Sequence, residues 1–397
     1  KVFGKSFSRT ADLHIHVYPV TIDSTSLWVT QWYDTSPLAL GLMNKGKAVP
    51  PFSPRYWELL AVIAHKMADY DQNVVLISPL QLTQYKLKNG KYDFDFSRFD
   101  KTAEIFKKAG VLKRVEGGHI AGRMGGWDSQ IGATVPIISS DTTVFEKHPI
   151  TDEQVSGFYK QFIPALVDHL KEKGWYGIYM QHIADEPTDA NYGSYEQIAS
   201  FIRKLAPGIQ LMDACHTHKI KLDVWVPQLD LLHKDYKFYR QQQEAGNIVW
   251  FYTCMWPEDE YASRFIEVPL LRTRIMHWIN FRYGLPGYLY WSFNPGRHGP
   301  RPFAETTDQN DQEGGGILPA GDSYIVYPGY GKLYSSIRLE AMRDGIYDYE
   351  LLKMLARKQP GKAKDICRRV VIDFNVYDTE IRSFREKRKQ ILELLSK

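Results

Sequence analysis

Short apolar runs alternate with amphipathic helical patterns along most of the chain. This alternation is typical of repeated βα units around a parallel sheet. The runs predict eight strands, at residues 26–32, 73–79, 111–122, 176–184, 209–215, 222–229, 247–254 and 287–294. Eight strands separated by helices over roughly 270 residues have the size of a (β/α)8 barrel. Eight is more parallel strands than most open doubly wound sheets contain. We therefore predict an α/β fold of the TIM barrel class.

The expected helices carry recognisable terminal residues. Ser53 followed by Pro predicts the start of a helix that reaches about residue 70. Ser97 and Gly110 are the expected N-cap and C-terminal glycine of a second helix, and Thr151 is the expected N-cap of a long amphipathic one. These helices fall between consecutive predicted strands, where the outer ring of a barrel needs them.

The two ends of the chain fall outside the eight βα units. Residues 1–20, with the alternating pattern DLHIHVYPV, are expected to be the end of an N-terminal β domain. Residues 21–397 would form the barrel, with the helical segment after residue 331 as a C-terminal extension of its outer ring. A segment rich in Gly, Pro and polar residues spans 294–331, and loops of this length are usually functional lids or disordered.

Composition narrows the class of protein. Of the 397 residues, 24% are charged and 44% hydrophobic, which excludes a disordered or fibrous chain. A net charge of +4 without a dense Lys/Arg run argues against a nucleic-acid partner. No apolar run approaches the roughly 18 residues of a membrane span. The 10 Trp and 25 Tyr residues favour a carbohydrate ligand, because flat amphipathic rings stack on sugars.

The cysteines and the first residue constrain redox state and location only weakly. Cys215, Cys254 and Cys367 are far apart and follow no CxxC spacing, so we expect neither a disulfide framework nor a zinc site. We expect no other metal and no cofactor. The chain opens at Lys1 without a signal peptide, and a periplasmic or secreted location is compatible with the sequence but not specified by it.

Two adjacent carboxylates follow the fourth predicted strand, in the stretch YMQHIADEPTD. Neighbouring residues of a strand point to opposite faces, so Asp185 and Glu186 can reach one ligand only if the strand has ended and the chain turns. Pro187 favours such a turn and is expected to hold Glu186 in extended geometry. The C-terminal ends of barrel strands carry the active site. A catalytic pair and a solvated pair capping the next helix are both open on this pattern.

Polar and aromatic side chains at other strand ends are candidate substrate-binding residues. The set is His119, His182, Trp225, Trp250, Tyr252, Trp291 and Asn294. Aromatic rings stack on sugars, whereas imidazole, hydroxyl and amide groups hydrogen-bond to sugar hydroxyls. Large side chains also fill barrel interiors, so at least one of the three tryptophans is expected to be structural and at least one to line the sugar pocket. The two histidines could equally be buried and bonded to the backbone.

The carboxylate pair also limits the reaction mechanism. A retaining glycosidase with a protein nucleophile needs a second carboxylate about 5 Å from the acid. Glu258 lies several residues beyond the seventh strand and the eighth strand ends at Asn294, so neither offers a well-placed carboxylate. Adjacent carboxylates can instead serve substrate-assisted hydrolysis. One is the acid/base, while its neighbour orients a 2-acetamido group whose carbonyl oxygen attacks C1.

Five segments, in this order, resemble the catalytic domain of glycoside hydrolase family 123, the retaining β-N-acetylgalactosaminidases. They are DEP, LDVWVPQL, IVWFYTC, GYLYWSFN and YPGYGKLYSSIRLEAMRDGIYDYELL, and the likeness extends over about residues 20–360. The resemblance implies an exo-glycosidase that releases non-reducing terminal β-linked N-acetylgalactosamine from a glycan through an oxazoline or oxazolinium intermediate. It also implies that Asp185 orients the acetamido group and that Glu186 is the acid/base.

Three other functions fit parts of the sequence. His14 and His16 have the HxH spacing of metal-dependent amidohydrolases, and the segment CHTH at 215–218 could supply further imidazoles. Outward-facing histidines on one strand explain that spacing equally well. A retaining β-glycosidase with a protein carboxylate nucleophile would share the barrel, although it would carry Asn where this chain has Asp185. A carbohydrate-binding module would keep the aromatic residues without catalysis.

Overall fold

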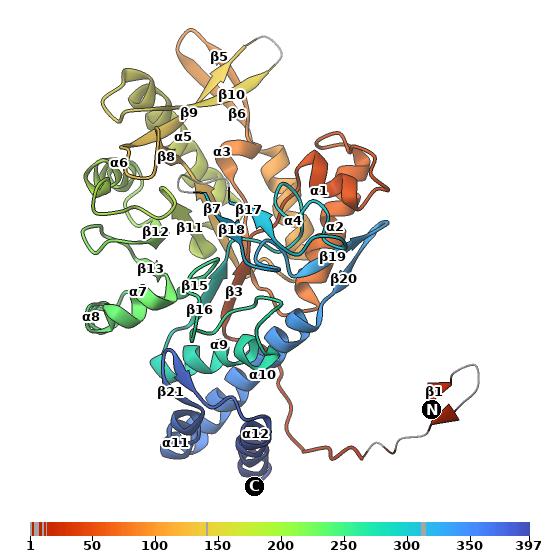
Figure 1. The fold of residues 1–397 in the computed structure, drawn as a ribbon. Coiled ribbons are helices and arrows are strands. Elements are labelled where there is room, and N and C mark those ends of the chain that lie inside the picture. The colour runs from red at the N-terminus through yellow and green to blue at the C-terminus, as the bar shows by residue number, and fades with distance from the viewer. Residues whose placement is uncertain (1, 4–7, 10–11, 13, 140–141, 311–314) are drawn as a thin grey trace.

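Parallel strands form the centre of the molecule (Figure 1). The computed structural model describes the chain except residues 1, 4–7, 10–11, 13, 140–141 and 311–314. The central strands are β3 (Trp28–Gln31), β4 (Val74–Leu76), β7 (Arg114–His119), β11 (Tyr179–His182), β12 (Gln210–Cys215), β13 (Val224–Pro227), β14 (Ile248–Val249), β15 (Phe251–Thr253) and β16 (Gly287–Tyr290). They form a six-stranded sheet in the order β14-β13-β12-β11-β7-β4 and a three-stranded sheet in the order β15-β16-β3. The fold is therefore mixed α/β, as predicted.

Each of the eight predicted strands contains at least one observed strand, and every pair within the two central sheets is parallel. The observed strands are shorter than the apolar runs that predicted them. The run at 247–254 divides into β14 and β15 at Trp250. Apolarity therefore marks where a strand lies, but it does not mark where the hydrogen-bonded ladder ends.

Single contacts join the edges of the two central sheets. Between β3 and β4, the Asn73 side chain accepts from the Val29 N–H at 2.9 Å and donates to the Leu27 carbonyl at 2.8 Å. On the other side, a parallel bridge pairs Gln228, which follows β13, with Tyr252 of β15. These contacts link β3 to β4 and β15 to the residue that follows β13.

Helices follow most of the central strands and pack against them. They are α1 (Pro37–Leu42), α2 (Pro54–Ala68), α3 (Pro79–Leu82), α4 (Ser97–Ala109), α5 (Glu153–Glu172), α6 (Tyr192–Leu205), α7 (Leu229–Lys234), α8 (Tyr236–Glu244), α9 (Leu270–Tyr283) and α10 (Ile337–Lys358), with a 3-10 turn at Tyr176–Ile178. Ser53 caps α2 as predicted, and Gly110 ends α4 at φ 92°. Two predicted caps are wrong by one residue, because Phe96 and Asp152 precede α4 and α5 in place of Ser97 and Thr151.

The strands bury both of their faces. On β13, Val224 and Val226 join an inner cluster with Met212 and Leu289, whereas Trp225 points outward to the helices. Alternation along a strand produces these two layers, since successive side chains leave opposite faces. Strands buried on both faces appear as continuous apolar runs, which is the pattern that predicted them.

Two antiparallel insertions were not predicted. One is the hairpin of β5 (Gln84–Lys88) and β6 (Lys91–Asp95). The other is a sheet of β8 (Ala121–Arg123), β9 (Ile131–Ile138) and β10 (Thr143–His148). Both follow central strands of the six-stranded sheet, and β8 begins within the apolar run that was expected to be one strand over 111–122.

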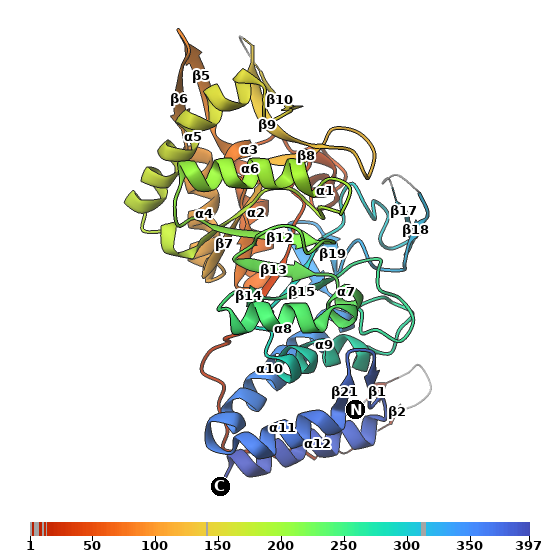
Figure 2. The same ribbon diagram turned by 90° about the vertical axis from the view of Figure 1, so that its left-hand side faces the viewer.

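The C-terminal part of the chain is helical, as predicted, and lies at the opposite end of the molecule from the β5–β6 hairpin (Figure 1, Figure 2). Helix α10 continues into α11 (Pro360–Val370), followed by β21 (Val371–Asp373), β22 (Val376–Tyr377) and α12 (Ile381–Leu395). The 294–331 segment contains β17 (Asp308–Gln309), β18 (Ile317–Leu318) and β19 (Val326–Gly329), and β19 pairs with β20 (Lys332–Ser335). Among the helices described, none is long and apolar enough to cross a membrane.

The N-terminal segment departs from the prediction. Strands β1 (Val2–Phe3) and β2 (Ser8–Arg9) pair with each other, and the described residues of 12–20 form no strand. The strand expected from DLHIHVYPV is therefore absent from those residues. An alternating pattern needs a neighbouring strand to complete its hydrogen bonds, and this segment has none among the described residues.

Candidate active site

A cavity of about 700 Å³ opens at the C-terminal ends of the central strands. Its lining includes Trp32, Trp127, Asp185, Glu186, His216, Gln228, Tyr252, Trp256, Trp291 and Asp322. These residues follow β3, β8, β11, β12, β13, β15 and β16 or belong to the 294–331 segment, apart from Tyr252 within β15. The cavity is therefore where a parallel α/β fold places its ligands. Its size suits a sugar or a short oligosaccharide.

A tight turn directs Asp185 and Glu186 into this cavity together. Glu186 has φ +46°, so it is not extended as Pro187 had suggested, and its N–H donates to the Ala214 carbonyl at 3.1 Å. The left-handed conformation costs a non-glycine residue roughly 1–2 kcal/mol. Arg123 holds the turn by donating to the Asp185 carbonyl at 3.1 Å and to the Glu186 carbonyl at 2.6 Å. This conformation gives adjacent side chains access to the same ligand.

Two side chains stabilise the charged form of Glu186. The Tyr252 hydroxyl donates to Glu186 Oε1, and His216 Nε2 lies 3.5 Å from the same oxygen and 2.7 Å from the Tyr252 hydroxyl. Burial alone would raise the pKa of Glu186, but His216 and Tyr252 outweigh burial and lower it. Burial alone would lower the pKa of His216, but the Glu186 carboxylate raises it. Glu186 and His216 therefore each favour the charged form of the other.

Asp185 has the opposite shift. Enclosure at the cavity floor, the Glu186 carboxylate and Asp213 together raise the pKa of Asp185 to about 7. The Asp185 side chain is 49% exposed, so its desolvation is incomplete and the two nearby carboxylates carry a substantial part of the shift. His119 Nε2 lies 3.8 Å from Asp185 Oδ1, beyond hydrogen-bond distance. The two adjacent acids are coupled, and near neutral pH they hold one proton between them.

A buried hydrogen-bond network supports the turn from behind. His182 Nδ1 lies 2.8 Å from Asp213 and Nε2 lies 3.0 Å from Glu116, which also accepts from the Trp32 indole at 2.9 Å. Burial lowers the pKa of His182, but the two carboxylates outweigh burial and raise it to about 10. Burial and the His182 charge lower the pKa of His119. His182 belongs to this network, whereas the His119 ring packs against the His182 ring at 4.8 Å between centroids and its Nε2 has no hydrogen-bond partner. Both were predicted to bind substrate, and neither is in the cavity lining.

Within the described residues, one group of side chains has the composition and spacing of a metal site. Ligand atoms of His119, His182 and Asp213 lie within 4.8 Å of one another. Both ring nitrogens of His182, however, already face carboxylates at hydrogen-bond distance. The donor set fits a hydrogen-bond network better than a metal ion, because a ligating imidazole needs a free nitrogen lone pair.

The histidine motifs that suggested a metal-dependent hydrolase do not converge. His14 and His16 are exposed in the N-terminal segment. His216 lines the cavity, whereas the His218 ring stacks on Phe238 of α8 with 4.1 Å between ring centroids. These four imidazoles therefore supply one cavity residue and no common ligand set.

The other predicted binding residues divide between the cavity and the core. Tyr252 and Trp291 line the cavity. Trp225 packs against Phe238 and Tyr239 on the outer face of its strand, with the Phe238 ring centroid 5.3 Å away. The other two lie elsewhere outside the cavity lining: Trp250 belongs to the inner cluster, and Asn294 bonds to the backbone of Asp34 through both ends of its amide.

Several cavity residues were not predicted. Trp127 and His216, which line the cavity, and Arg123, which holds the turn, lie outside the apolar runs or one residue beyond them, where a sequence pattern assigns no direction to a side chain. Asp322 comes from the 294–331 segment, whose length was the one available signal for it. Its Oδ1 accepts from the Tyr290 hydroxyl and the Trp291 indole, while Oδ2 is buried without a hydrogen-bond partner. Burial raises the pKa of Asp322 to about 6.

Comparison with solved structures places the chain among glycoside hydrolase folds. A family 123 glycoside hydrolase from Clostridium perfringens, studied for glycolipid glycan hydrolysis, superposes with a TM-score of 0.66 at 16% identity, over 94% of this chain and 68% of that chain. An endo-β-1,4-mannanase from Thermotoga petrophila superposes with a TM-score of 0.44 at 10% identity, over 82% of this chain and 77% of that chain. A GH39 enzyme from Xanthomonas axonopodis pv. citri superposes with a TM-score of 0.46 at 11% identity, over 85% of this chain and 68% of that chain.

The sequence profile of the glycoside hydrolase 123 catalytic domain matches residues 42–355. The chain therefore belongs to glycoside hydrolase family 123, and the protein is a glycoside hydrolase. The resemblance drawn from the five sequence segments is confirmed. The comparison with curated proteins gives no match.

Proposed function

We propose that this glycoside hydrolase removes terminal β-linked N-acetylgalactosamine from glycans with net retention, through substrate-assisted catalysis. The observation that carries the proposal is the turn that directs Asp185 and Glu186 into one cavity. Adjacent carboxylates lie too close together to act on opposite faces of a sugar, as an acid and a protein nucleophile must. They can instead engage the acetamido group and the glycosidic oxygen of one residue.

Substrate binding would move the shared proton to the residue that needs it. In the free enzyme the proton belongs to Asp185, whose pKa is raised, rather than to Glu186. An acetamido N–H that donates to Asp185 favours its ionised form. The new charge beside Glu186 then raises the proton affinity of Glu186, because the two groups are coupled. The bound substrate thus generates the general acid.

The reaction then takes two steps. Glu186 donates its proton to the glycosidic oxygen while the acetamido carbonyl oxygen attacks C1, so the C1–O bond breaks and the aglycone leaves as an alcohol. Asp185 accepts the N–H and offsets the positive charge of the oxazolinium ion. The Glu186 carboxylate next deprotonates a water molecule that attacks C1. The bond between C1 and the acetamido oxygen in the oxazolinium ring breaks, which restores the acetamido group. Two inversions at C1 give net retention.

The surrounding residues would bind the sugar. We propose that the Trp291 ring stacks on the sugar ring. The unpartnered Oδ2 of Asp322 would accept a hydrogen bond from a sugar hydroxyl. We assign structural roles to Trp225, Trp250 and Asn294 because they lie outside the cavity. His119 and His182 would position the carboxylate turn without touching the substrate.

We also propose that the two central sheets form one closed eight-stranded barrel. Strands β14 and β15 would be two parts of one barrel strand, interrupted at Trp250. The bridge between Gln228 and Tyr252 and the bonds of Asn73 to β3 support closure at the two seams. A closed barrel would direct all strand ends at one mouth, where the cavity lies.

One observation favours a second mechanism. Asp322 and Glu258 place two further carboxylates in the cavity lining, and Asp322 is the buried one, so a protein nucleophile is available in space. Burial raises its pKa, and the donors Tyr290 and Trp291 already occupy Oδ1, so Asp322 suits a hydrogen-bonding group better than an anionic nucleophile. A retaining glycosidase that forms an ester on Asp322 is nevertheless the alternative to test.

The decisive experiment compares matched aryl glycosides. We expect turnover of 4-nitrophenyl β-N-acetylgalactosaminide, no turnover of the corresponding β-galactoside without the acetamido group, and competitive inhibition by the N-acetylgalactosamine thiazoline. Glu186→Gln should lower kcat roughly 10²-fold or more on a natural glycan, whose leaving group is poor, and less on a dinitrophenyl glycoside. Asp185→Asn should impair hydrolysis of both the natural glycan and the dinitrophenyl glycoside. Mass spectrometry that finds a glycosyl ester on Asp322 would overturn the mechanism.

A further inference from the structure

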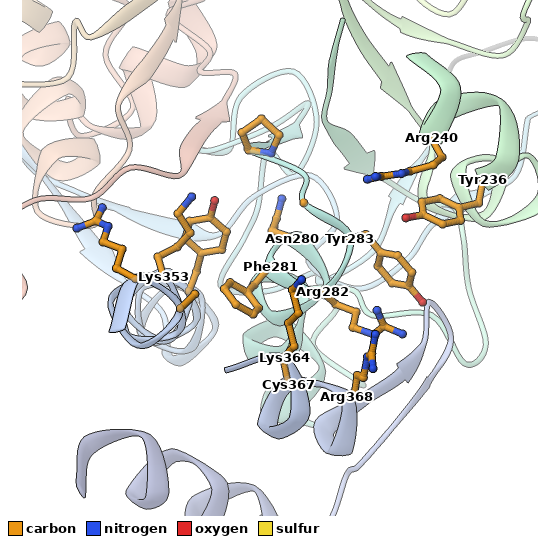
Figure 3. A pocket seen from close by; sticks show the side chains of 15 residues that line it. Tyr236, Arg240, Asn280, Phe281, Arg282, Tyr283, Lys353, Lys364, Cys367 and Arg368 are labelled. Carbon is orange, nitrogen blue, oxygen red and sulfur yellow. The ribbon is translucent and has the colours of Figure 1, made fainter. Parts of the chain in front are cut away.

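A second cavity, of about 670 Å³, lies between α8, α9, α10 and α11 (Figure 3). Six of its 15 lining residues are cationic and none is acidic. The cations, which define what we call the basic pocket, are Arg240, Arg282, Lys353, Arg357, Lys364 and Arg368. Figure 3 shows that the labelled side chains come from separate helices and surround one hollow.

The basic pocket lies at the other end of the strands from the candidate active site. It is lined by Gly284 and Pro286, which directly precede β16, whereas Leu289 and Trp291 near the end of β16 line the active-site cavity. Strand β16 therefore runs from one cavity to the other. A ligand in the basic pocket cannot contact Asp185 or Glu186.

Most cations of the basic pocket lack a counter-charge. Arg240 pairs with Glu244 on the same helix at 3.0 Å. In the described chain, no carboxylate lies within ion-pair distance of the other five. Arg282 Nε is buried without a hydrogen-bond partner, and its guanidinium lies over the Tyr283 ring, 5.2 Å from the centroid. Like charges that line one concave site repel one another, and a bound anion relieves this repulsion. The positive potential of the basic pocket therefore attracts a negatively charged ligand.

We propose that the basic pocket binds an anionic saccharide that carries sulfate or carboxylate groups. Four of the six cations are arginines, whose planar forks bind such oxyanions through paired hydrogen bonds. Tyr236, Phe281 and Tyr349 add aromatic surface against which a pyranose can pack. The volume suits a short oligosaccharide, and a concave site suits a soluble ligand better than a flat membrane surface. The inference is independent of the catalytic roles proposed for Asp185 and Glu186.

Calorimetric titration with a chondroitin 4-sulfate tetrasaccharide tests the proposal. The titration is done in the Glu186→Gln background, so that any hydrolysis of the probe is slow on the timescale of the titration. We expect saturable binding that weakens as NaCl is raised from about 50 to about 300 mM, because the attraction is electrostatic. The double variant Arg357→Gln with Arg368→Gln should weaken binding at least tenfold. Both residues are exposed, so the fold should survive their replacement.

A matched control removes the same charge outside the basic pocket. Arg369→Gln with Arg385→Gln changes exposed residues of α11 and α12 that do not line it, and should leave the affinity within twofold. Thermal unfolding of both double variants checks that each is folded. Equal loss of affinity in the two variants would overturn the proposal. So would equal binding of a neutral chitotetraose, or preferential binding of ATP or of phosphatidylserine vesicles.

Discussion

The carboxylate pair depends on the backbone of one residue. Glu186 adopts φ +46°, and without this conformation its side chain and that of Asp185 would leave opposite sides of the chain. Arg123 and the Ala214 carbonyl hold the turn through three hydrogen bonds. The identity and adjacency of the acids could be predicted from sequence. Their left-handed turn could not, because Pro187 favours extended geometry before it and the arginine that holds the turn comes from β8.

The shared proton predicts how activity depends on pH. The pair holds one proton below the raised pKa of Asp185, about 7, and loses it as pH rises through that value. Because the lost proton is the one that Glu186 must donate, kcat/KM should fall on the alkaline side from about pH 7. On the acid side it should fall only below the lowered pKa of Glu186. A pH profile of kcat/KM that stays flat to pH 9 would contradict this assignment.

Removing one hydroxyl should shift that profile. Tyr252→Phe deletes the donor to Glu186 Oε1, so the carboxylate loses stabilisation and its pKa rises. The acid limb of the kcat/KM profile, which reports Glu186, should then move to higher pH by about 0.5–1 unit, whereas the alkaline limb, which reports the proton on Asp185, should move less. Tyr288→Phe is the matched control, because its hydroxyl bonds to Thr253 in the core. A profile that moves equally in both variants would show that Tyr252 acts only through packing.

Sequence patterns were most informative at the level of the central strands. Each apolar run contains a strand because parallel strands bury both faces, which leaves a continuous apolar signal. The β5–β6 hairpin has no such signal, because one face is polar and exposed and only the other, with Tyr85, Tyr92 and Phe94, packs against α5. Trp225 and Trp250 were indistinguishable from Trp291 in sequence for a related reason. The direction of each ring depends on where its strand ends, and apolar runs do not specify that.

The start of β16 offers a test of close packing between elements. A Cβ on Gly287 would lie 2.1 Å from Cδ2 of the Trp250 ring, deep in the inner cluster, where neither group can move aside. Gly287→Ala should therefore lower the free energy of unfolding by about 1–3 kcal/mol. In contrast, Gly157 lies inside α5 with nothing within 4 Å of a Cβ, so Gly157→Ala should stabilise by about 0.5–1 kcal/mol. Urea denaturation measures both changes.

At the scale of the molecule, one buried carboxylate joins the C-terminal helices to the rest of the fold. Asp348 of α10 is fully buried and accepts two hydrogen bonds from Arg274 of α9, at 2.6 and 2.9 Å. It also accepts from Arg388 of α12 at 2.8 Å and from the Trp278 indole at 3.1 Å. Three helices thus meet at one side chain, and α9 also provides residues of the basic pocket. The sequence predicted the helical segment after residue 331, but not that Asp348 within it would pair with Arg274 and Arg388.

Loss of this carboxylate should destabilise the whole molecule without altering catalysis. Asp348→Ala leaves two guanidinium groups facing a buried site without a counter-charge, and should cost about 2–4 kcal/mol, because water reaches the arginines only in part. Asp344 is the matched control: it pairs with Arg274 at 3.2 Å but is 46% exposed. Asp344→Ala should therefore cost less than about 1 kcal/mol. Both variants, folded in the absence of urea, should keep the wild-type pH profile, since neither residue borders the active-site cavity. Equal urea midpoints for the two variants would show that Asp348 does not hold the helices together.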